Sequence, residues 1–247
     1  MSAFASLGGT DHDGLTQRPA GSGRSVGRGG NHLVNEARYL AIEGAIGVGK
    51  TSLATLLGRR LGARLVLERP DENPFLDDFY RDPRRYAFKT QLFFTLSRFM
   101  QQQEFAQHDL FHDRVIADYM FAKDKIFAYL TLDDKELALY EKLVELIEPQ
   151  VPVPDLVIYL QATTDVLSER INRRNRSYER RLSQEYLKSV NEAYNYHFFH
   201  YTAGPLLVVN TSEIDFVHRQ ADLDDLIAEI RRPHAGITFY GPGKSVS

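Results

Sequence analysis

Short apolar runs alternate along this chain with longer segments in which apolar residues recur every three or four positions. The short runs predict buried strands, and the helical spacing of the longer segments predicts helices. The expected strands comprise residues 39–42, 64–68, 115–117, 156–160 and 206–209. Five strands that alternate with helices predict an α/β fold, a five-stranded parallel sheet with helices on both faces.

The expected helices comprise residues 52–61, 86–107, 119–130, 133–147, 183–201 and 223–231, with a further helix that starts at Thr164. One of them carries clear end signals. Asp133 can cap its N-terminus, Glu136 follows three residues later in a relative of the capping box, and Pro149 ends it. The third strand has a second possible start, because residues 110–112 could begin it earlier.

Both ends of the chain differ in composition from its middle. Residues 1–35 hold eight of the seventeen glycines and few aliphatic residues, so we expect this segment to be disordered. Residues 233–247 have the composition of a Gly/Pro-rich tail. The stretch between them, residues 36–232, is long enough for one large α/β domain and shows no sign of a second core.

The composition of the chain limits the binding partners and the cellular locations that we expect. The net charge of −3 gives no general attraction to nucleic acid or to an anionic membrane. The chain has no cysteine, which excludes disulfides and thiolate metal sites and suits a reducing cytoplasm. No apolar run approaches the roughly 18 residues that span a bilayer, and the N-terminus lacks the apolar core of a signal peptide. We therefore expect a soluble, cytoplasmic protein that binds neither nucleic acid nor membranes.

A glycine-rich motif follows the first expected strand. Residues 44–51 fit G-x-x-x-x-G-K-[ST] at every fixed position, and a helical pattern follows them. The members of this phosphate loop are Gly44, Ala45, Ile46, Gly47, Val48, Gly49, Lys50 and Thr51. The backbone N–H groups favour an anion, Lys50 adds charge for the β- and γ-phosphates, and Thr51 offers a hydroxyl to Mg²⁺.

Phosphoryl transfer also needs a base for the acceptor and positive charge on the transferred group. Glu68 ends the second expected strand, and it can reach a hydroxyl near the phosphate loop because parallel strand ends share one edge of the sheet. Six arginines lie within twelve residues, namely Arg170, Arg173, Arg174, Arg176, Arg180 and Arg181. This run predicts a lid over a triphosphate. An RNA-binding surface is the rival, although Tyr178 is the one aromatic residue among the arginines.

The motifs together resemble the deoxynucleoside kinase family of deoxycytidine, deoxyguanosine and deoxyadenosine kinases, in its bacterial type. The resemblance runs from about Tyr39 to Arg231. The matching segments are residues 42–51, Glu68 before Pro70, Tyr80 with Asp82-Pro83, Gln91, Leu96-Ser97-Arg98, residues 159–163, Arg174 with Arg176, and residues 185–187. The resemblance implies a P-loop kinase fold with an arginine-rich lid, and a homodimer.

The resemblance also implies a role for each matched side chain. Glu68 matches the catalytic base for the 5′-hydroxyl. The acceptor set comprises Gln91 and Arg98 on the nucleobase, and Tyr80 with Glu179 on the sugar 3′-hydroxyl. The donor set comprises Arg170, Arg174 and Arg176 on the phosphates, and Asp215 with Phe216 against the adenine of ATP.

One motif departs from the family pattern, which places Glu-Arg-Ser or Asp-Arg-Ser after the third strand. Asp113-Arg114 keeps the pair but lacks the serine, with Asp113 as the carboxylate linked to Mg²⁺ and Arg114 as a catalytic cation. Asp118 follows the better apolar strand but precedes Tyr119 instead of arginine. We favour Asp118 as the magnesium-linked carboxylate. Asp124 then completes the base-reading set, whereas Asp118 completes it in the other register.

We therefore predict that the protein, with Mg²⁺, transfers the γ-phosphoryl group of ATP to the 5′-hydroxyl of a deoxyribonucleoside. An enzyme rival is a thymidylate-type nucleoside monophosphate kinase, which needs a further basic contact for the acceptor phosphate. A non-enzymatic rival is a P-loop protein that binds nucleotide or RNA. The nucleobase stays open, because the amide of Gln91 both donates and accepts hydrogen bonds.

Overall fold

Six parallel strands form one sheet in the part of the chain that the computed structural model describes, residues 37–108, 114–176 and 178–241. The strands are β1 (Tyr39–Glu43), β2 (Arg64–Val66), β3 (Val115–Ala117), β4 (Leu156–Gln161), β5 (Leu206–Asn210) and β6 (Ile237–Tyr240). Their order in the sheet is β2-β3-β1-β4-β5-β6. The predicted α/β fold with a parallel sheet is confirmed.

The prediction of five strands is wrong, because β6 lies in the segment that we expected to be a tail. Ile237–Tyr240 pairs in parallel with β5, with Leu206 opposite Ile237 and Val209 opposite Tyr240. Its four residues, Ile237-Thr238-Phe239-Tyr240, favour a strand, but they lie between Gly236 and Gly241 in a stretch whose glycine and proline content indicated a tail. Ile237 and Phe239 of this edge strand are exposed, whereas Thr238 and Tyr240 are half-buried.

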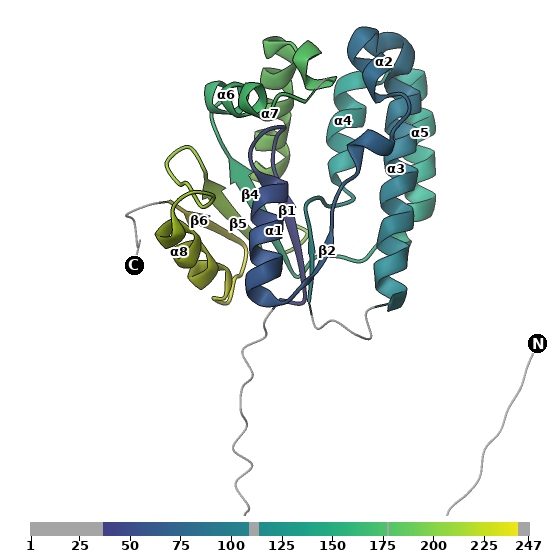
Figure 1. Cartoon of the computed structure of the whole chain (residues 1–247). Coiled ribbons are helices and arrows are strands. Elements are labelled where there is room, and N and C mark those ends of the chain that lie inside the picture. The colour runs from purple at the N-terminus through teal and green to yellow at the C-terminus, as the bar shows by residue number, and fades with distance from the viewer. Residues whose placement is uncertain (1–36, 109–113, 177, 242–247) are drawn as a thin grey trace, which may run out of the picture. The chain divides into compact units, whose positions relative to one another are not determined.

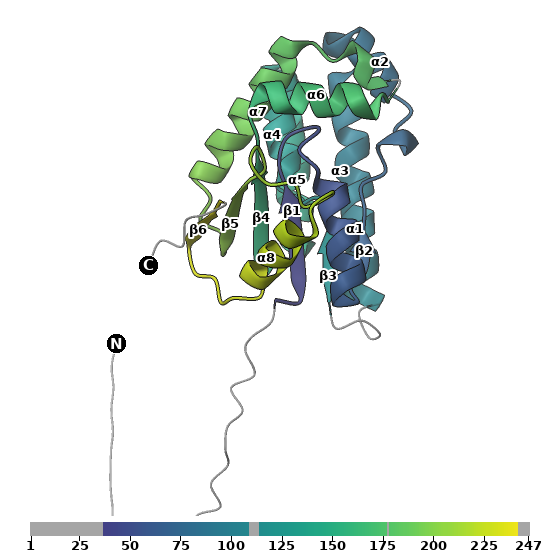
Figure 2. The ribbon, with the colours of Figure 1, turned by 60° about the vertical axis from the view of Figure 1, so that its left-hand side comes forward.

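Helices cover both faces of the sheet (Figure 1). One face carries α1 (Lys50–Leu61) and α8 (Gln220–Ile230), which lie side by side (Figure 2) and are joined by an ion pair between Arg60 and Asp224 at 2.8 Å. The other face carries α3 (Pro83–His108), α4 (Lys123–Thr131), α5 (Asp134–Ile147) and α7 (Gln184–Phe199). Within the described residues, no helix combines the length and the apolar character needed to cross a membrane.

The remaining helical segments lie mainly beyond the carboxyl ends of the strands. They are α2 (Leu76–Arg81), α6 (Thr164–Arg174) and the short 3₁₀ segments η1 (Pro70–Glu72), η2 (Glu148–Gln150) and η3 (Tyr178–Arg181). In Figures 1 and 2, α2 and α6 occupy the upper end of the view, above the sheet. This end of the sheet is where the phosphate loop leaves β1.

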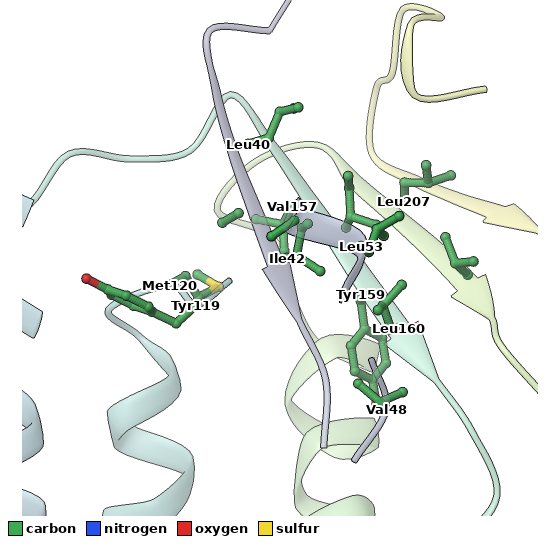
Figure 3. Packing of buried hydrophobic residues seen from close by; sticks show 14 of the residues in the cluster. Leu40, Ile42, Val48, Leu53, Tyr119, Met120, Val157, Tyr159, Leu160 and Leu207 are labelled. Atoms are coloured by element: carbon green, nitrogen blue, oxygen red, sulfur yellow. The ribbon is translucent and has the colours of Figure 1, made fainter. Parts of the chain in front are cut away.

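The centre of the sheet is buried on both faces. Ile42 of β1, Val157 of β4 and Leu53 of α1 are fully buried. Figure 3 shows these three side chains gathered in one core. Because both faces of a central parallel strand are covered, its residues form a continuous apolar run instead of an alternating pattern. This property is the reason that the sequence identified β1 and β4 so clearly.

The predicted N-cap of α5 is confirmed. Asp133 Oδ1 accepts from the backbone N–H groups of Lys135 and Glu136, both at 2.9 Å, and Glu136 Oε2 accepts from Asp133 N at 3.3 Å. Asp133→Ala is therefore expected to lower the free energy of unfolding by about 1 kcal/mol, measured by urea denaturation. Asp134→Ala at the next position removes no cap and is the matched control. Equal losses in both variants would contradict the cap as the cause.

Candidate active site

The carboxyl ends of β1, β2 and β3 meet at one edge of the sheet. The parallel register pairs Ala41 with Ala117, and Ala117 with Val66. The residues that follow these positions are therefore neighbours. In this way the structure brings together the phosphate loop after β1, Glu68 after β2 and Asp118 after β3.

The phosphate loop curls because its glycines adopt backbone angles that other residues rarely adopt. Gly44 has φ +146°, and a Cβ atom there would lie 2.5 Å from the carbonyl oxygen of Leu160 in β4. Gly49 has φ +109° and is the N-cap residue of α1. The helix therefore begins at Lys50, and its first N–H groups lie in the loop, which is the geometry that binds phosphate.

Lys50 folds back over this loop. Its ammonium donates to the carbonyl oxygens of Gly44 at 2.7 Å and of Ala45 at 3.2 Å. Burial and, to a smaller extent, repulsion from Lys123 lower the pKa of Lys50 to about 8, against the attraction of Glu43, Glu68 and Asp118. An anion in the loop would stabilise this charge, so the site is suited to phosphate.

Thr51 and Asp118 place oxygen atoms beside the loop. Thr51 Oγ1 donates to Asp118 Oδ2 at 2.5 Å, and Glu68 N donates to Asp118 Oδ1 at 2.7 Å. Mg²⁺ is usually held by one or two carboxylates together with phosphates and waters, so these two side chains fit that ion. Within the described residues, no group of three His, Cys, Asp or Glu side chains could hold a metal. An ion at this place would therefore depend on phosphate oxygens as well.

The structure separates the two registers proposed for the acid motif. Asp118 is 2% exposed and lies beside the phosphate loop. Arg114 lies at the opposite end of β3, where it lines a different cavity with Arg38 and Asp155. The expectation that Arg114 is a catalytic cation is therefore wrong, because the whole length of β3 separates it from the site. Asp113 lies outside the described residues.

Glu68 is held by two cations from different helices. Arg98 of α3 donates from Nε to Oε1 at 3.1 Å, and Lys123 of α4 donates from Nζ to Oε2 at 2.8 Å. Burial alone would raise the pKa of Glu68, but the charges and hydrogen bonds of Arg98 and Lys123 outweigh it and hold the pKa well below its usual range. Glu68 is therefore ionised at neutral pH and can accept a hydrogen bond from a hydroxyl.

Gln91, Arg98 and Asp124 form a polar cluster beneath Glu68. Arg98 forms an ion pair with the carboxylate of Asp124. Gln91 Nε2 donates to the backbone oxygen of Asp124 at 3.0 Å and to its Oδ1 at 3.3 Å. Asp124 Oδ2 is buried, and no hydrogen-bond partner reaches it from the described residues. A buried acceptor of this kind is suited to a donor group on a ligand.

A cavity of about 200 Å³ connects this polar cluster to the phosphate loop. Its polar lining includes Lys50, Thr51, Glu68, Tyr80, Gln91, Arg98, Asp118, Lys123, Arg174, Arg176 and Glu179. Its apolar lining includes Phe79, Phe94, Phe127 and Tyr186. Glu179 is 5% exposed and forms an ion pair with Arg174 of α6. Aromatic walls with a few convergent polar groups are typical of a site for a small molecule with a flat ring.

A second cavity of about 680 Å³ lies beside Gly47, Val48 and Gly49 of the loop. Its lining includes Arg170, Arg173, Arg174, Asp215 and Phe216. Arg170 ties α6 to the loop, because its guanidinium donates to Val48 O at 3.1 Å and to Thr211 O at 2.7 Å. Of the predicted donor residues, Arg170, Arg174, Asp215 and Phe216 therefore line this cavity, whereas Arg176 lines only the smaller one.

The arginine run divides between these two cavities and the surface. Arg176 lines the smaller cavity with Arg174, and Arg173 lines the larger one. Arg181 of η3 forms an ion pair with Asp77 of α2 at 3.0 Å. The side chains of Tyr178 and Arg180 lie outside the described part of the chain.

Sequence reasoning missed two charged residues of the site, Lys123 and Glu43. Lys123 occupies the first position of α4, where the helix dipole disfavours a cation, but the sequence predicted a helix that begins at residue 119 and so gave no signal of this misfit. Glu43 is the one acid in the apolar run of β1 and is fully buried. Its carboxylate accepts from Met120 N at 2.7 Å and Gly44 N at 3.2 Å. Burial raises the pKa of Glu43, against the attraction of Lys123 and Lys50.

Residues 40–234 of the chain match the sequence model of the family described as deoxynucleoside kinase. The chain is 34% identical over 203 residues to the deoxyguanosine kinase of Bacillus subtilis (strain 168). This aligned region covers 80% of this chain and 98% of that protein. It is 37% identical over 163 residues to the deoxyadenosine kinase of Dictyostelium discoideum. This aligned region covers 65% of this chain and 66% of that protein.

The fold is similar to that of a solved structure, deoxyadenosine kinase from M. mycoides with bound dCTP. The TM-score is 0.66 at 24% sequence identity, over 78% of this chain and 98% of that chain. At this identity the likeness concerns the fold. It agrees with the P-loop kinase fold that the family resemblance implied.

Proposed function

Because this chain belongs to the deoxynucleoside kinase family, we propose that it transfers the γ-phosphoryl group of ATP to the 5′-hydroxyl of a deoxyribonucleoside. Family membership makes the protein a phosphotransferase with a nucleotide donor and a deoxynucleoside acceptor. One observation carries the finer proposal: Glu68 lines the same cavity as Lys50 of the phosphate loop and Gln91 of the polar cluster. A nucleoside seated on that cluster would have its sugar beside Glu68.

In this proposal each side chain around the cavity has its own role in phosphoryl transfer. Glu68 orients the 5′-hydroxyl and accepts its proton as the hydroxyl attacks. Lys50 and the lid arginines Arg170, Arg174 and Arg176 stabilise the charge that develops on the transferred group. Tyr80 and Glu179, which line the same cavity, hold the sugar. Asp215 and Phe216 line the donor cavity and contact the adenine.

We assign Mg²⁺ to Thr51 and Asp118 together with phosphate oxygens of the donor. The support is chemical, since both side chains offer oxygen ligands next to the loop. When bound, the ion would neutralise phosphate charge and hold the donor in line with the acceptor.

For the acceptor we favour a purine deoxyribonucleoside. The two relatives described above are kinases of deoxyguanosine and deoxyadenosine, which are both purine nucleosides. Asp124 offers a buried carboxylate oxygen that no described residue occupies, and Arg98 beside it offers N–H donors. Guanine and adenine both present an N–H group next to an acceptor and can pair with this arrangement, but pyrimidines present one as well, so the preference for a purine rests on the relatives.

The direct test measures ATP consumption by the full chain with Mg²⁺, against each of four deoxyribonucleosides and thymidine monophosphate. We expect turnover on nucleosides, with the highest kcat/KM on a purine. Turnover restricted to the monophosphate would support the monophosphate kinase instead, and ATP binding without turnover would support a non-enzymatic protein. A preference for a pyrimidine would overturn the purine assignment alone.

We also propose a homodimer that works in the cytoplasm. Helices α4 and α7 pack against each other and carry apolar side chains with large exposed fractions, 62% for Tyr129, 72% for Tyr196 and 78% for Phe199. Exposed apolar surface of this kind is typical of an interface. The absence of cysteine supports a location in the reducing cytoplasm. Light scattering tests the assembly, and a particle of 28.2 kDa, the mass of one chain, would contradict it.

A further inference from the structure

Lys123 is a buried cation in an unfavourable local position. It is the first residue of α4, and its side chain is 4% exposed. The positive end of the helix dipole repels a cation there, and burial of an ammonium is costly unless it is paired. Its Nζ atom lies 2.8 Å from Oε2 of Glu68. A contact with Glu68, 55 positions away in the chain, therefore explains a lysine at this place better than local helix formation does.

The two oxygens of the Glu68 carboxylate have different partners. Oε1 accepts from Arg98, and Oε2 accepts from Lys123. Arg98 is shared, because its guanidinium also pairs with Asp124 in the polar cluster. The ion pair of Lys123 within the described residues is with Glu68. A nucleobase that draws Arg98 toward Asp124 would leave Lys123 as the cation that holds the carboxylate.

Neighbouring side chains do not supply this charge. Tyr119, directly after Asp118, is fully buried and donates its hydroxyl to Gln101 Oε1 at 2.7 Å. Figure 3 shows its hydroxyl pointing away from the sheet. Lys125, two positions after Lys123, donates to Glu148 at 2.7 Å. In the segment from Tyr119 to Lys125, Lys123 is thus the cation that pairs with Glu68, whereas Asp124 pairs with Arg98 and Lys125 with Glu148.

We propose that Lys123 is a positioning residue for phosphoryl transfer, which holds the carboxylate of Glu68 toward the acceptor 5′-hydroxyl while Arg98 engages the nucleobase. This inference rests on the proposed role of Glu68 as base. In the step itself, the 5′-oxygen forms a bond to the γ-phosphorus, and the bond from that phosphorus to the β–γ bridging oxygen breaks. The hydroxyl proton passes to Glu68, ADP leaves, and Lys123 keeps its own proton.

The first test compares Lys123→Met, Lys123→Arg and the control Lys125→Met. Lys123→Met keeps the apolar stem and removes the charge, so kcat is expected to fall roughly 10²-fold, as for a misplaced general base. The KM values for ATP and nucleoside are expected to stay within about threefold, because neither ligand loses a contact. Lys123→Arg should recover part of kcat, and Lys125→Met should leave it unchanged.

A second test separates charge from space filling. The chain has no cysteine, so Lys123→Cys introduces a single thiol. Alkylation of the unfolded variant with 2-bromoethylamine, followed by refolding, rebuilds a lysine-shaped side chain with its ammonium. Alkylation with 1-bromopropane gives a neutral group of the same length. We expect the aminoethyl form to regain kcat to within about tenfold of the unmodified chain and the propyl form to stay low.

Thermal unfolding of both alkylated forms checks that they are folded to the same extent. Equal kcat in the two forms would show that Lys123 only fills space, and near-normal kcat in Lys123→Met would also overturn the inference. Failure of the inference is distinguishable from failure of the proposed function. If Glu68→Gln is inactive while Lys123→Met is fully active, only Lys123 loses its role. If Glu68→Gln is fully active, the role of Glu68 itself is wrong.

Discussion

Glu68→Gln is expected to lower kcat by roughly 10²- to 10⁴-fold, the range that loss of a general base produces. Glutamine keeps the size of the side chain but is neutral and a poor proton acceptor. The ATP site is expected to persist, because the contacts of Lys50 in the loop, with Gly44 O and Ala45 O, do not involve this side chain. The measurement pairs steady-state kcat on the preferred nucleoside with a Kd for ATP by equilibrium dialysis.

Glu72→Gln is the matched control for this experiment. Glu72 lies four positions later, on the surface, in an ion pair with Arg69 at 3.1 Å. The same chemical change there is expected to leave kcat unchanged, because exposed ion pairs contribute little. A Glu68→Gln variant that keeps most of its kcat would contradict the assignment of Glu68 as base. Loss of ATP binding together with kcat would instead indicate a damaged phosphate loop.

Arg98→Met is expected to lower the free energy of unfolding by about 3–5 kcal/mol, since it breaks a buried ion pair by removing one partner. The Arg98 side chain is 5% exposed and lies between the carboxylates of Glu68 and Asp124. Methionine fills similar space, but it leaves Asp124 without its positive partner in a fully buried position. Urea denaturation followed by circular dichroism measures the loss.

Two further variants show whether unpaired charge is the cause. Arg81→Met removes an arginine that also contacts two carboxylates, Asp77 and Asp78, but on the surface. Its expected loss is below about 1 kcal/mol. Adding Asp124→Asn to Arg98→Met should recover part of the stability, because it removes one of the stranded charges. No recovery in the double variant would indicate that packing of the arginine stem matters more than its charge.

The strands and the phosphate loop could be predicted because they depend on contiguous residues. A central parallel strand such as β1 is apolar along most of its length, and a phosphate loop needs glycine at positions with positive φ, so both leave a pattern in neighbouring letters. The capping box of Asp133 and Glu136 is local in the same sense. The order in which strands, the loop and helices follow one another was therefore enough to predict the fold class and the phosphate-binding part of the site.

The edge strand β6 escaped prediction for the opposite reason. It is only four residues long and lies between Gly236 and Gly241, so the composition around it indicated a turn-rich tail. Its identity as a strand comes from hydrogen bonds to β5, about thirty residues earlier in the chain. Local sequence carries little information about a partner at that separation.

The chain by itself determined the phosphate loop, the buried strands and the family to which both belong. The tertiary structure placed Asp118 beside the loop and Arg114 at the far end of β3, because only the register of β3 against β1 shows which end of the strand meets the loop. It also decided that Lys123 faces Glu68 across 55 positions. A motif consists of residues that are adjacent in the chain, so the sequence alone shows it. A buried charge is stable only when an oppositely charged partner packs against it, and that partner can lie anywhere in the chain.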